Sequence, residues 1–316
     1  MLSFVVQRLL QALPVLFLSS LLVFLFIRLV PGDPAVTLAG TRASAQQIDA
    51  LRHRFALDQP LATQYLVWLA NLAKGDFGTS YLSQRPVSAL IQQRLPVTVH
   101  LALGAMLVTL LAGAPAGLFV ATHPRHILSR AVGLANAVAL ATPTFWLGIL
   151  LLLLFAVGLR WLPASGFVSM LDNPVQSLRL LVLPSVTLGL YSTAIMVRFL
   201  RATIAEVDTA DFVRTAHAKG LPVRLVLRRH ILRIALLPVI TVMAVQFGYL
   251  LSGAVITESI FGLPGLGRLM VDSILGRDYL VVQASMLLFV GTFILVNAGA
   301  DICQAILDPR TRRRAA

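Results

Sequence analysis

Long apolar runs separated by shorter charged segments dominate the pattern of this chain. About 20 apolar residues, at ~1.5 Å rise per residue in a helix, cover the ~30 Å hydrocarbon core of a bilayer. Runs of this kind lie at residues 9–30, 97–121, 131–157, 180–197, 234–257 and 280–300. Prolines within them, Pro115, Pro143 and Pro184, are expected to kink the helices. The pattern therefore predicts an all-α membrane protein with six transmembrane helices.

The charged segment between the fourth and fifth runs is the most distinctive polar stretch. Residues 211–238 read DFVRTAHAKGLPVRLVLRRHILRIALLP, with an apolar run on each side, so this segment must lie in water. Gly220 is expected to end one helix with a positive φ, and Pro222 to lie in the first turn of the next. The sequence thus predicts a helix–turn–helix held by two spans, which suits docking onto another protein.

The distribution of basic residues predicts the orientation in the membrane. With the amino terminus inside, the cytoplasmic segments hold arginines at positions 8, 125, 130, 198 and 201, the basic residues between 214 and 233, and those between 310 and 314. The short outer loops, 158–179 and 258–279, hold only Arg160, Arg179, Arg268 and Arg277. Because Lys and Arg accumulate in short cytoplasmic loops, both termini are predicted to be cytoplasmic (N-in, C-in).

The long outer segment, residues 31–96, is predicted to fold. Ser44 is a candidate cap for a first helix, Pro60 begins a second, and the Gly75–Gly78 sequence is expected to turn the chain. This small helical extracytoplasmic subdomain either shields the mouth of the bundle or contacts a delivering protein. The expected organisation is a first segment and span at 1–30, the outer segment at 31–96, a five-helix core at 97–305 that includes the charged loop at 202–233, and a basic tail at 306–316.

Composition agrees with a membrane protein. The chain is 58% hydrophobic and 12% charged, against about 25% charged residues in soluble domains. The net charge of +13 lies beside the spans rather than on an aromatic-studded face, which favours the lipid bilayer over nucleic acid as its partner. The single cysteine, Cys303, excludes an intrachain disulfide and is expected to be a packed thiol in the last span.

Motifs for catalysis are missing from the sequence. A phosphate-binding loop of the form G-x-x-x-x-G-K-[ST] needs a lysine, and Lys74 and Lys219 both follow alanine. No H-E-x-x-H motif occurs, and the six histidines are scattered. The sequence predicts no catalytic, cofactor-binding or metal-binding residue, so the chain is not expected to be an enzyme by itself.

Polar residues within the spans are the candidates for a transport pathway. Apart from His100, and from Arg28 at the end of the first run, the expected spans contain no Asp, Glu, Lys, Arg or His, which argues against a proton-coupled secondary transporter. Milder polar groups remain, and these are Asn136, Thr142, Thr144, Gln246, Ser252, Thr292 and Asn297. Each could line a pathway or form a hydrogen bond between helices, which membrane bundles use routinely.

The charged loop resembles a known motif. FVRTAHAKGL at 212–221 and RHILRIALLP at 229–238 resemble the EAA loop of ABC importer permeases, in the form found in dipeptide, oligopeptide, glutathione and nickel permeases of the B type. Phe212, His217 and Ile234 replace the usual Tyr, Arg and Asn. The segments LDQPLATQYLVWL, ESIFGLPGLGRLMVDSILGRDYLVVQ and LDPR resemble the same family, so the resemblance spans nearly the whole chain.

The resemblance implies a type I ABC importer permease fold in the bacterial cytoplasmic (inner) membrane. It implies that the EAA-type loop couples to an ATPase, and the residues that match its motif are Arg214, Thr215, Ala216, Lys219, Gly220, Leu221 and Arg229. The implied partners are a second homologous permease subunit in a heterodimer, two cytoplasmic ABC ATPase subunits that bind ATP and Mg, and an extracytoplasmic substrate-binding protein.

The cargo is the least determined part of this reading. Di- and oligopeptides are the commonest cargo of the family that the chain resembles, and glutathione and nickel are alternatives. A secondary transporter or channel and a membrane scaffold without transport are the readings from other classes. Co-purification with an ATPase would separate the importer from both.

Overall fold

The computed structural model describes residues 2–29, 34–39, 43–54 and 57–307. In that part of the chain every regular element is a helix, apart from an isolated bridge between Thr79 and Pro86. The chain forms two compact units. Unit 1 holds Met1–Val5, Val99–Leu263 and Leu295–Ala316, and unit 2 holds Val6–Thr98 and Pro264–Ile294.

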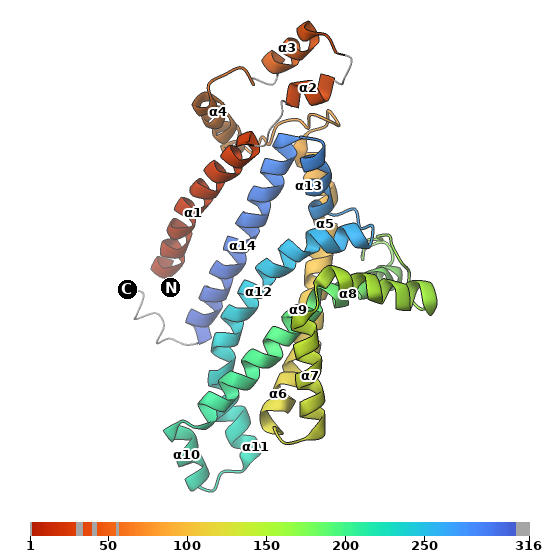
Figure 1. Ribbon diagram of the computed structural model, residues 1–316. Coiled ribbons are helices and arrows are strands. Elements are labelled where there is room, and N and C mark those ends of the chain that lie inside the picture. Colours follow the sequence, from red (N-terminus) through yellow and green to blue (C-terminus); the bar gives the residue numbers. More distant parts are fainter. Residues whose placement is uncertain (1, 30–33, 40–42, 55–56, 308–316) are drawn as a thin grey trace. The chain divides into compact units, whose positions relative to one another are not determined.

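One long helix, α9 (Pro174–Asp208), is the centre of unit 1 (Figure 1). The Asn173 side chain caps its start by accepting a hydrogen bond from the Gln176 backbone N–H at 3.0 Å. The helices that pack against α9 are α6 (Ala114–Thr122), α7 (Ile127–Ala141), α8 (Thr144–Leu151) and α12 (Leu232–Ile260). In its most apolar window 61% of α9 is buried, against 33–39% in the other long helices, so α9 is the core element.

A glycine allows α9 to approach α5 (Val87–Val108) closely. A Cβ at Gly189 would lie 2.6 Å from the Ala105 carbonyl oxygen, which no real side chain tolerates. The neighbouring Thr109 opens a π-helical turn, η1 (Thr109–Gly113), and its Oγ1 donates to the Gly189 carbonyl at 3.2 Å. In a bilayer the hydrophobic effect does not drive helices together, because lipid tails are themselves apolar. Close packing at small residues and hydrogen bonds from hydroxyl groups stabilise the helix pairs instead.

The third expected span is not a single helix. Instead of one span over 131–157, α7 ends at Ala141, and a second helical segment of α8 and η2 (Leu152–Gly158) runs at 110° to it. Thr142 is extended, with φ −91° and ψ 126°, because the ring of Pro143 disfavours helical geometry in the residue before it. Pro143 therefore breaks the span rather than bending it gently, whereas Pro184 lies inside the continuous α9.

The other expected spans are helical and longer than their apolar runs. Four helical stretches have the length and apolarity to cross a membrane: Val87–Thr122, Pro174–Asp208, Val223–Ile260 and Tyr279–Leu307. The bent pair gives a fifth, and α1 (Leu2–Leu29), whose apolar part is Leu10–Leu25, lies where the first was expected. Helical hydrogen bonding continues into polar residues, so α5 begins at Val87, inside the segment expected to be an outer loop.

In the described part of the outer segment, the structure has three helices before α5 rather than two: α2 (Pro34–Ala39), α3 (Ala45–Arg54) and α4 (Leu61–Ala73). Ser44 caps α3 as expected: its Oγ accepts from the Gln47 N–H at 3.3 Å, while Gln47 Oε1 accepts from the Ser44 N–H at 2.9 Å. The expected turn after α4 is present, with φ of 79° at Gly75 and 77° at Gly78.

A buried carboxylate ties the loop after α4 to the start of α14 (Tyr279–Leu307). Asp278 is 1% exposed and accepts hydrogen bonds from Ser80 Oγ at 2.5 Å, the Tyr81 N–H at 3.1 Å and the Leu82 N–H at 3.3 Å. The same unit contains α13 (Leu266–Leu275), whose Leu266 N–H donates to Thr98 Oγ1 at 2.8 Å. Unit 2 is thus held by polar contacts between segments distant in sequence.

Candidate functional site

The charged loop is a helix–turn–helix. Helix α10 (Asp211–Ala218) ends in a turn in which the Gly220 N–H donates to the His217 carbonyl at 2.9 Å and the Leu221 N–H donates to the Ala216 carbonyl at 3.3 Å. This pair of bonds is a Schellman motif, and Gly220 has the positive φ, 73°, that the motif requires. The expected turn is therefore confirmed. Pro222 occupies the N-cap position, one residue before the short helix α11 (Val223–Val226) rather than in its first turn, and its carbonyl accepts from the Leu225 N–H at 2.9 Å.

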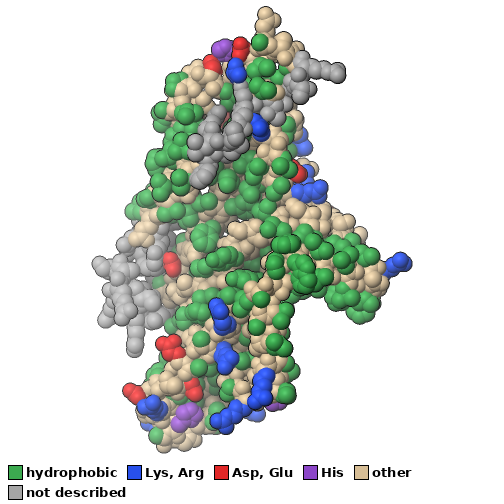
Figure 2. Space-filling view, viewed as in Figure 1, with side chains coloured by type: hydrophobic (Ala, Val, Ile, Leu, Met, Phe, Trp, Pro, Cys, Tyr) green, Lys and Arg blue, Asp and Glu red, His purple; other side chains and the backbone are tan. Residues whose placement is uncertain are grey.

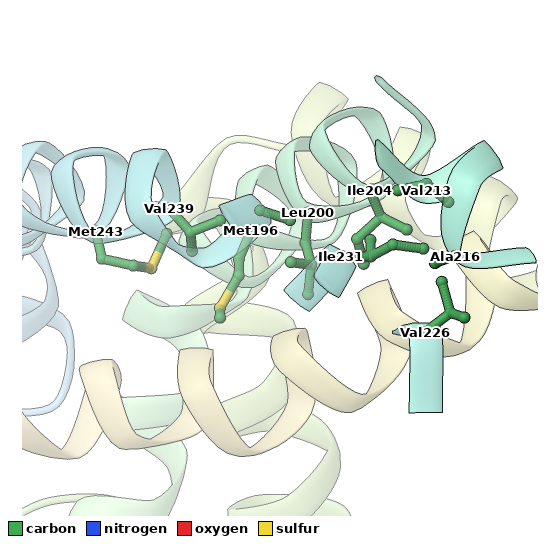
Figure 3. Packing of buried hydrophobic residues seen from close by; sticks show 10 residues of the cluster. Met196, Leu200, Ile204, Val213, Ala216, Val226, Ile231, Val239 and Met243 are labelled. Atoms are coloured by element: carbon green, nitrogen blue, oxygen red, sulfur yellow. The ribbon is translucent and has the colours of Figure 1, made fainter. Parts of the chain in front are cut away.

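An apolar cluster fastens this helix–turn–helix to the long helices (Figure 3). The cluster consists of Met196, Leu200 and Ile204 on α9, Val213 and Ala216 on α10, Val226 on α11, Ile231 on η3 (Leu227–Ile231), and Ala235, Val239 and Met243 on α12. Val213, Val226 and Ala235 are completely enclosed. One cluster therefore joins the loop to both α9 and α12.

The residues expected to contact an ATPase divide into two groups. Exposed side chains or backbone are found at Arg214, Thr215, Lys219, Gly220 and Arg229. Ala216 is 5% exposed and belongs to the apolar cluster, and Leu221 is half-buried against it. Ala216 and Leu221 therefore hold the loop together, and the exposed five are free to meet a partner.

Three exposed apolar side chains on the loop were missed by the sequence reasoning. Phe212 is 42% exposed, Val223 70% and Leu225 39%. Apolar residues in a segment that must lie in water were the available signal for them. The same loop carries exposed basic side chains, at Arg214, Lys219, Arg224, Arg228 and Arg229. Figure 2 shows Lys and Arg gathered at the end of unit 1 that carries α10 and α11, while hydrophobic side chains cover the sides of its helices. Apolar residues within a charged rim are typical of a protein–protein interface.

The candidate pathway residues occupy several different environments. Gln246 is 6% exposed, and its Oε1 accepts from Ser192 Oγ at 3.2 Å, which joins α12 to α9. Thr142 donates to the Val138 carbonyl at 2.7 Å and ends α7, and Thr292 donates to the Leu288 carbonyl at 2.7 Å. All three hydrogen bonds are explained by contacts within or between helices. A role of these three residues in a transport pathway stays a prediction.

The remaining candidates lie at half-buried or exposed positions. Asn136 is half-buried and lines a cavity of about 300 Å³ with Arg198 and Arg201. Thr144 begins α8, directly after the break in the third span. Ser252 is exposed on α12, and Asn297 is half-buried on α14. Asn136, Thr142 and Thr144 thus lie along the broken span, on both sides of the bend.

Two expectations about the spans were wrong. Glu258 was placed in an outer loop, but α12 continues to Ile260, and Glu258 is fully buried in its last turn. Asp301 likewise lies in α14, so each of these two helices carries an acidic residue just beyond its expected apolar run. Cys303 was expected to be packed, but its thiol is exposed within this chain. Hydropathy locates the apolar part of a helix but not its ends or its buried face.

Among the residues that the structure describes, no group of three or more His, Cys, Asp or Glu side chains could hold a metal ion.

Known proteins match the chain along its length. The family of binding-protein-dependent transport system inner membrane components matches residues 113–313, and its N-terminal membrane-component family matches residues 1–102. The glutathione transport system permease protein GsiC of Escherichia coli K12 is 42% identical over 312 residues, which cover 99% of each chain. GsiC of Shigella dysenteriae serotype 1 matches equally, and GsiC of Shigella flexneri serotype 5b is 41% identical over the same coverage.

A solved structure shares the fold. The inward-facing methionine ABC transporter MetNI matches with a TM-score of 0.58 and 16% identity, over 70% of this chain and 97% of that chain. At this identity the likeness shows the fold alone, which is that of a type I ABC importer permease.

Proposed function

This chain belongs to the family of inner membrane components of binding-protein-dependent transport systems, and from that premise we propose that it carries glutathione, or a peptide of similar size, through the membrane. The chain is a multi-pass permease subunit of a bacterial ABC importer in the inner membrane. In this family, ATP hydrolysis takes place in partner ATPase subunits. The proposal concerns the cargo and the way in which hydrolysis is coupled to its movement.

The GsiC relatives are the main support for glutathione as cargo. They are 41–42% identical over 99% of the chain, and their names describe glutathione transport. Peptides were the first expectation from the sequence and glutathione an alternative, and the relatives favour that alternative. Glutathione is itself a tripeptide, so both readings ask for a pathway that accepts amide groups and charged ends. Nickel, the other alternative, becomes an arm of the test.

The cluster of Figure 3 is the observation that supports coupling through the loop. Arg214, Lys219 and Arg229 on the loop are exposed, while Val213 and Val226 are enclosed against α9 and α12. A domain movement can alter a pathway only if a rigid element links the two. We therefore assign α10 and α11 as the element that receives the motion of the ATPase.

The complete transporter is proposed to contain two permease chains. Each chain offers one helix–turn–helix, and ABC ATPases of this kind close on nucleotide as a pair, so two loops are needed. A second, related permease chain, two ATPase subunits and an extracytoplasmic binding protein complete the assembly. A purified complex with this chain as its only membrane subunit would favour a homodimer instead.

Uptake by the reconstituted complex tests the proposal. Proteoliposomes containing the permease pair and the ATPases, with the binding protein outside, should accumulate radiolabelled glutathione only when ATP is enclosed. Parallel samples with radiolabelled dipeptide or radiolabelled Ni²⁺ in place of glutathione measure the alternatives. Accumulation of Ni²⁺ but not of glutathione would contradict the proposed cargo, and uptake without any ATPase would contradict the importer mechanism.

A further inference from the structure

Unit 2 contains a cavity that lies apart from the helix–turn–helix of α10 and α11. Its volume is about 440 Å³, within the range of roughly 300–1,000 Å³ typical of small-molecule sites. The cavity lies between α1, α4, the loop that follows α4 and the first turns of α14, all within unit 2. The loop and α4 belong to the outer segment, so this cavity is expected to face the side from which cargo arrives.

Aromatic side chains form fixed walls of the cavity. Phe24 is 2% exposed, Trp68 9% and Tyr81 5%. The Phe24 and Trp68 rings are 6.0 Å apart between centroids, and both contact Tyr65, whose hydroxyl lies 2.9 Å from Ser20 Oγ. These contacts hold the rings in place. A flat amide group or a short apolar stem can lie against such faces without any rearrangement.

Polar groups without partners line the same cavity. Gln283 on α14 is 2% exposed, and among the described residues its side-chain amide has no hydrogen-bond partner. Gln64 in the α4 wall donates through Nε2 to the Gln59 carbonyl at 2.7 Å, yet its buried Oε1 lacks a partner there. A buried carboxamide left unpaired is costly, so such groups are normally satisfied by a ligand or by water.

Two further groups complete the chemistry. Asn71 on α4 adds a half-buried carboxamide, and the exposed Asp76 lines the cavity with its carboxylate, whose Oδ1 also accepts from the Gly78 N–H at 2.8 Å. Carboxamides both donate and accept, which matches the N–H and C=O of a peptide group. A carboxylate matches an ammonium. An acyl chain of a lipid would leave all of these groups unpaired.

We propose that this cavity is a binding site for a short peptide, with its amide groups on Gln283 and Asn71, its ammonium toward Asp76 and its stem against Trp68. The site deepens the proposed function, on which its choice of ligand rests. It would hold cargo released by the binding protein before that cargo enters the spans. The permease would then contribute to selecting its cargo.

Binding without the binding protein is the direct test. The assembled permease–ATPase complex in lipid nanodiscs, without nucleotide, is dialysed to equilibrium against radiolabelled glutathione. Saturable binding is expected. Gln283→Leu, which removes one hydrogen-bonding group at constant size, should weaken binding about tenfold, and Trp68→Phe, which offers the stem a smaller ring face, should weaken it several-fold.

Gln92→Leu is the matched control. It makes the same replacement at an exposed glutamine on α5, outside the cavity, and should leave binding unchanged. If Gln283→Leu prevents assembly, Asn71→Ala at its half-buried position provides the second variant, with an expected loss of about fivefold. Wild-type affinity in Gln283→Leu or in Asn71→Ala would overturn the proposal. So would a phospholipid that native mass spectrometry finds at this site and that glutathione does not displace.

Uptake by the same preparations separates this site from the cargo assignment. Import of glutathione by a wild-type complex that shows no saturable binding would refute the cavity and leave the proposed function standing. Saturable, Gln283-dependent binding in a complex that imports neither glutathione nor a dipeptide would support the site and refute the cargo.

Discussion

Gly220 is a residue whose substitution has a purely conformational cost. Its φ is 73°, and a Cβ built there would meet nothing within 4 Å. An L-residue in this left-handed conformation costs about 1–2 kcal/mol, and the turn can escape that cost only by changing the direction of α11. The expected effect is therefore on geometry and not on space.

Gly220→Val should leave membrane insertion intact, weaken co-purification of the ATPase and abolish cargo uptake. Gly133→Val is the matched control, because Gly133 lies in α7 with no atom within 4 Å of its Cβ position and no positive φ. Arg313→Ala, in the tail outside the described residues, should reduce uptake less than Gly220→Val does. Normal uptake by the Gly220→Val complex would contradict the coupling role of the loop.

Local chemistry explains which residue-scale predictions succeeded. The positive φ at Gly220 and the cap at Ser44 follow from short-range rules, and the structure contains both. The exposure of Cys303 and the burial of Glu258 depend on which helices cover them. Sequence rules that act over a few residues cannot tell which helices cover a side chain. The exposure of Cys303 and the burial of Glu258 were therefore not predicted.

At the scale of elements, substitutions at the two valines of α11 distinguish a role in packing from a role in docking. Val226 is completely enclosed and Val223 is 70% exposed, although both belong to the same four-residue helix. Val226→Ala should leave a cavity and cost about 1–3 kcal/mol, seen as faster hydrogen exchange across α10 and α11. Val223→Ala should change stability by less than about 0.5 kcal/mol yet weaken ATPase association.

The opposite pattern would contradict the interface assignment. If Val223→Ala binds the ATPase as tightly as the wild type while Val226→Ala keeps normal hydrogen exchange, the partner meets another surface.

The break between α7 and α8 is set by Pro143. Pro143→Ala removes the steric restriction on Thr142, so the two helices should approach a continuous span and lose much of their 110° bend. Spin labels at Leu134 and Leu150, both exposed, should then move apart, and transport should fall. An unchanged distance would mean that packing against α9, and not the proline, holds the bend.

The sequence could predict this proline only in part. Hydropathy is continuous over 131–157, so one span was the natural prediction, and a proline in such a run can either kink a helix or break it. Pro184 lies in an equally apolar run and leaves α9 continuous. Tertiary packing decides between the two outcomes.

For the whole molecule, orientation is the prediction that the other assignments depend on. In a Cys303→Ser background, cysteines at Ser44 and Gly265 should react with an impermeant maleimide in intact spheroplasts. Cysteines at His217 and Thr311 should react only after permeabilisation. Protection of Gly265 until the membrane is opened would contradict the N-in, C-in arrangement, because the loop after α12 would then be cytoplasmic.

The positions of the apolar runs were accessible from the sequence because bilayer thickness sets a minimum length for every span. The two-unit organisation was not, because unit 2 combines residues 6–98 with 264–294 through contacts such as Ser80 with Asp278. Pairings between segments this far apart leave no trace in composition or periodicity.

The length of α12 determines how far its outer end would move when the end next to α10 and α11 tilts. Its 29 residues make a rod of about 43 Å at ~1.5 Å per residue. If the end fastened to α10 and α11 tilts by about 10°, the opposite end, which carries the buried Glu258, sweeps through about 7 Å, more than the ~5.4 Å of one helical turn. A displacement of that size is enough for side chains to exchange neighbours. The helix would then act as a lever that turns a small movement at the α10–α11 end into a larger one at the Glu258 end, without any backbone hydrogen bond being broken.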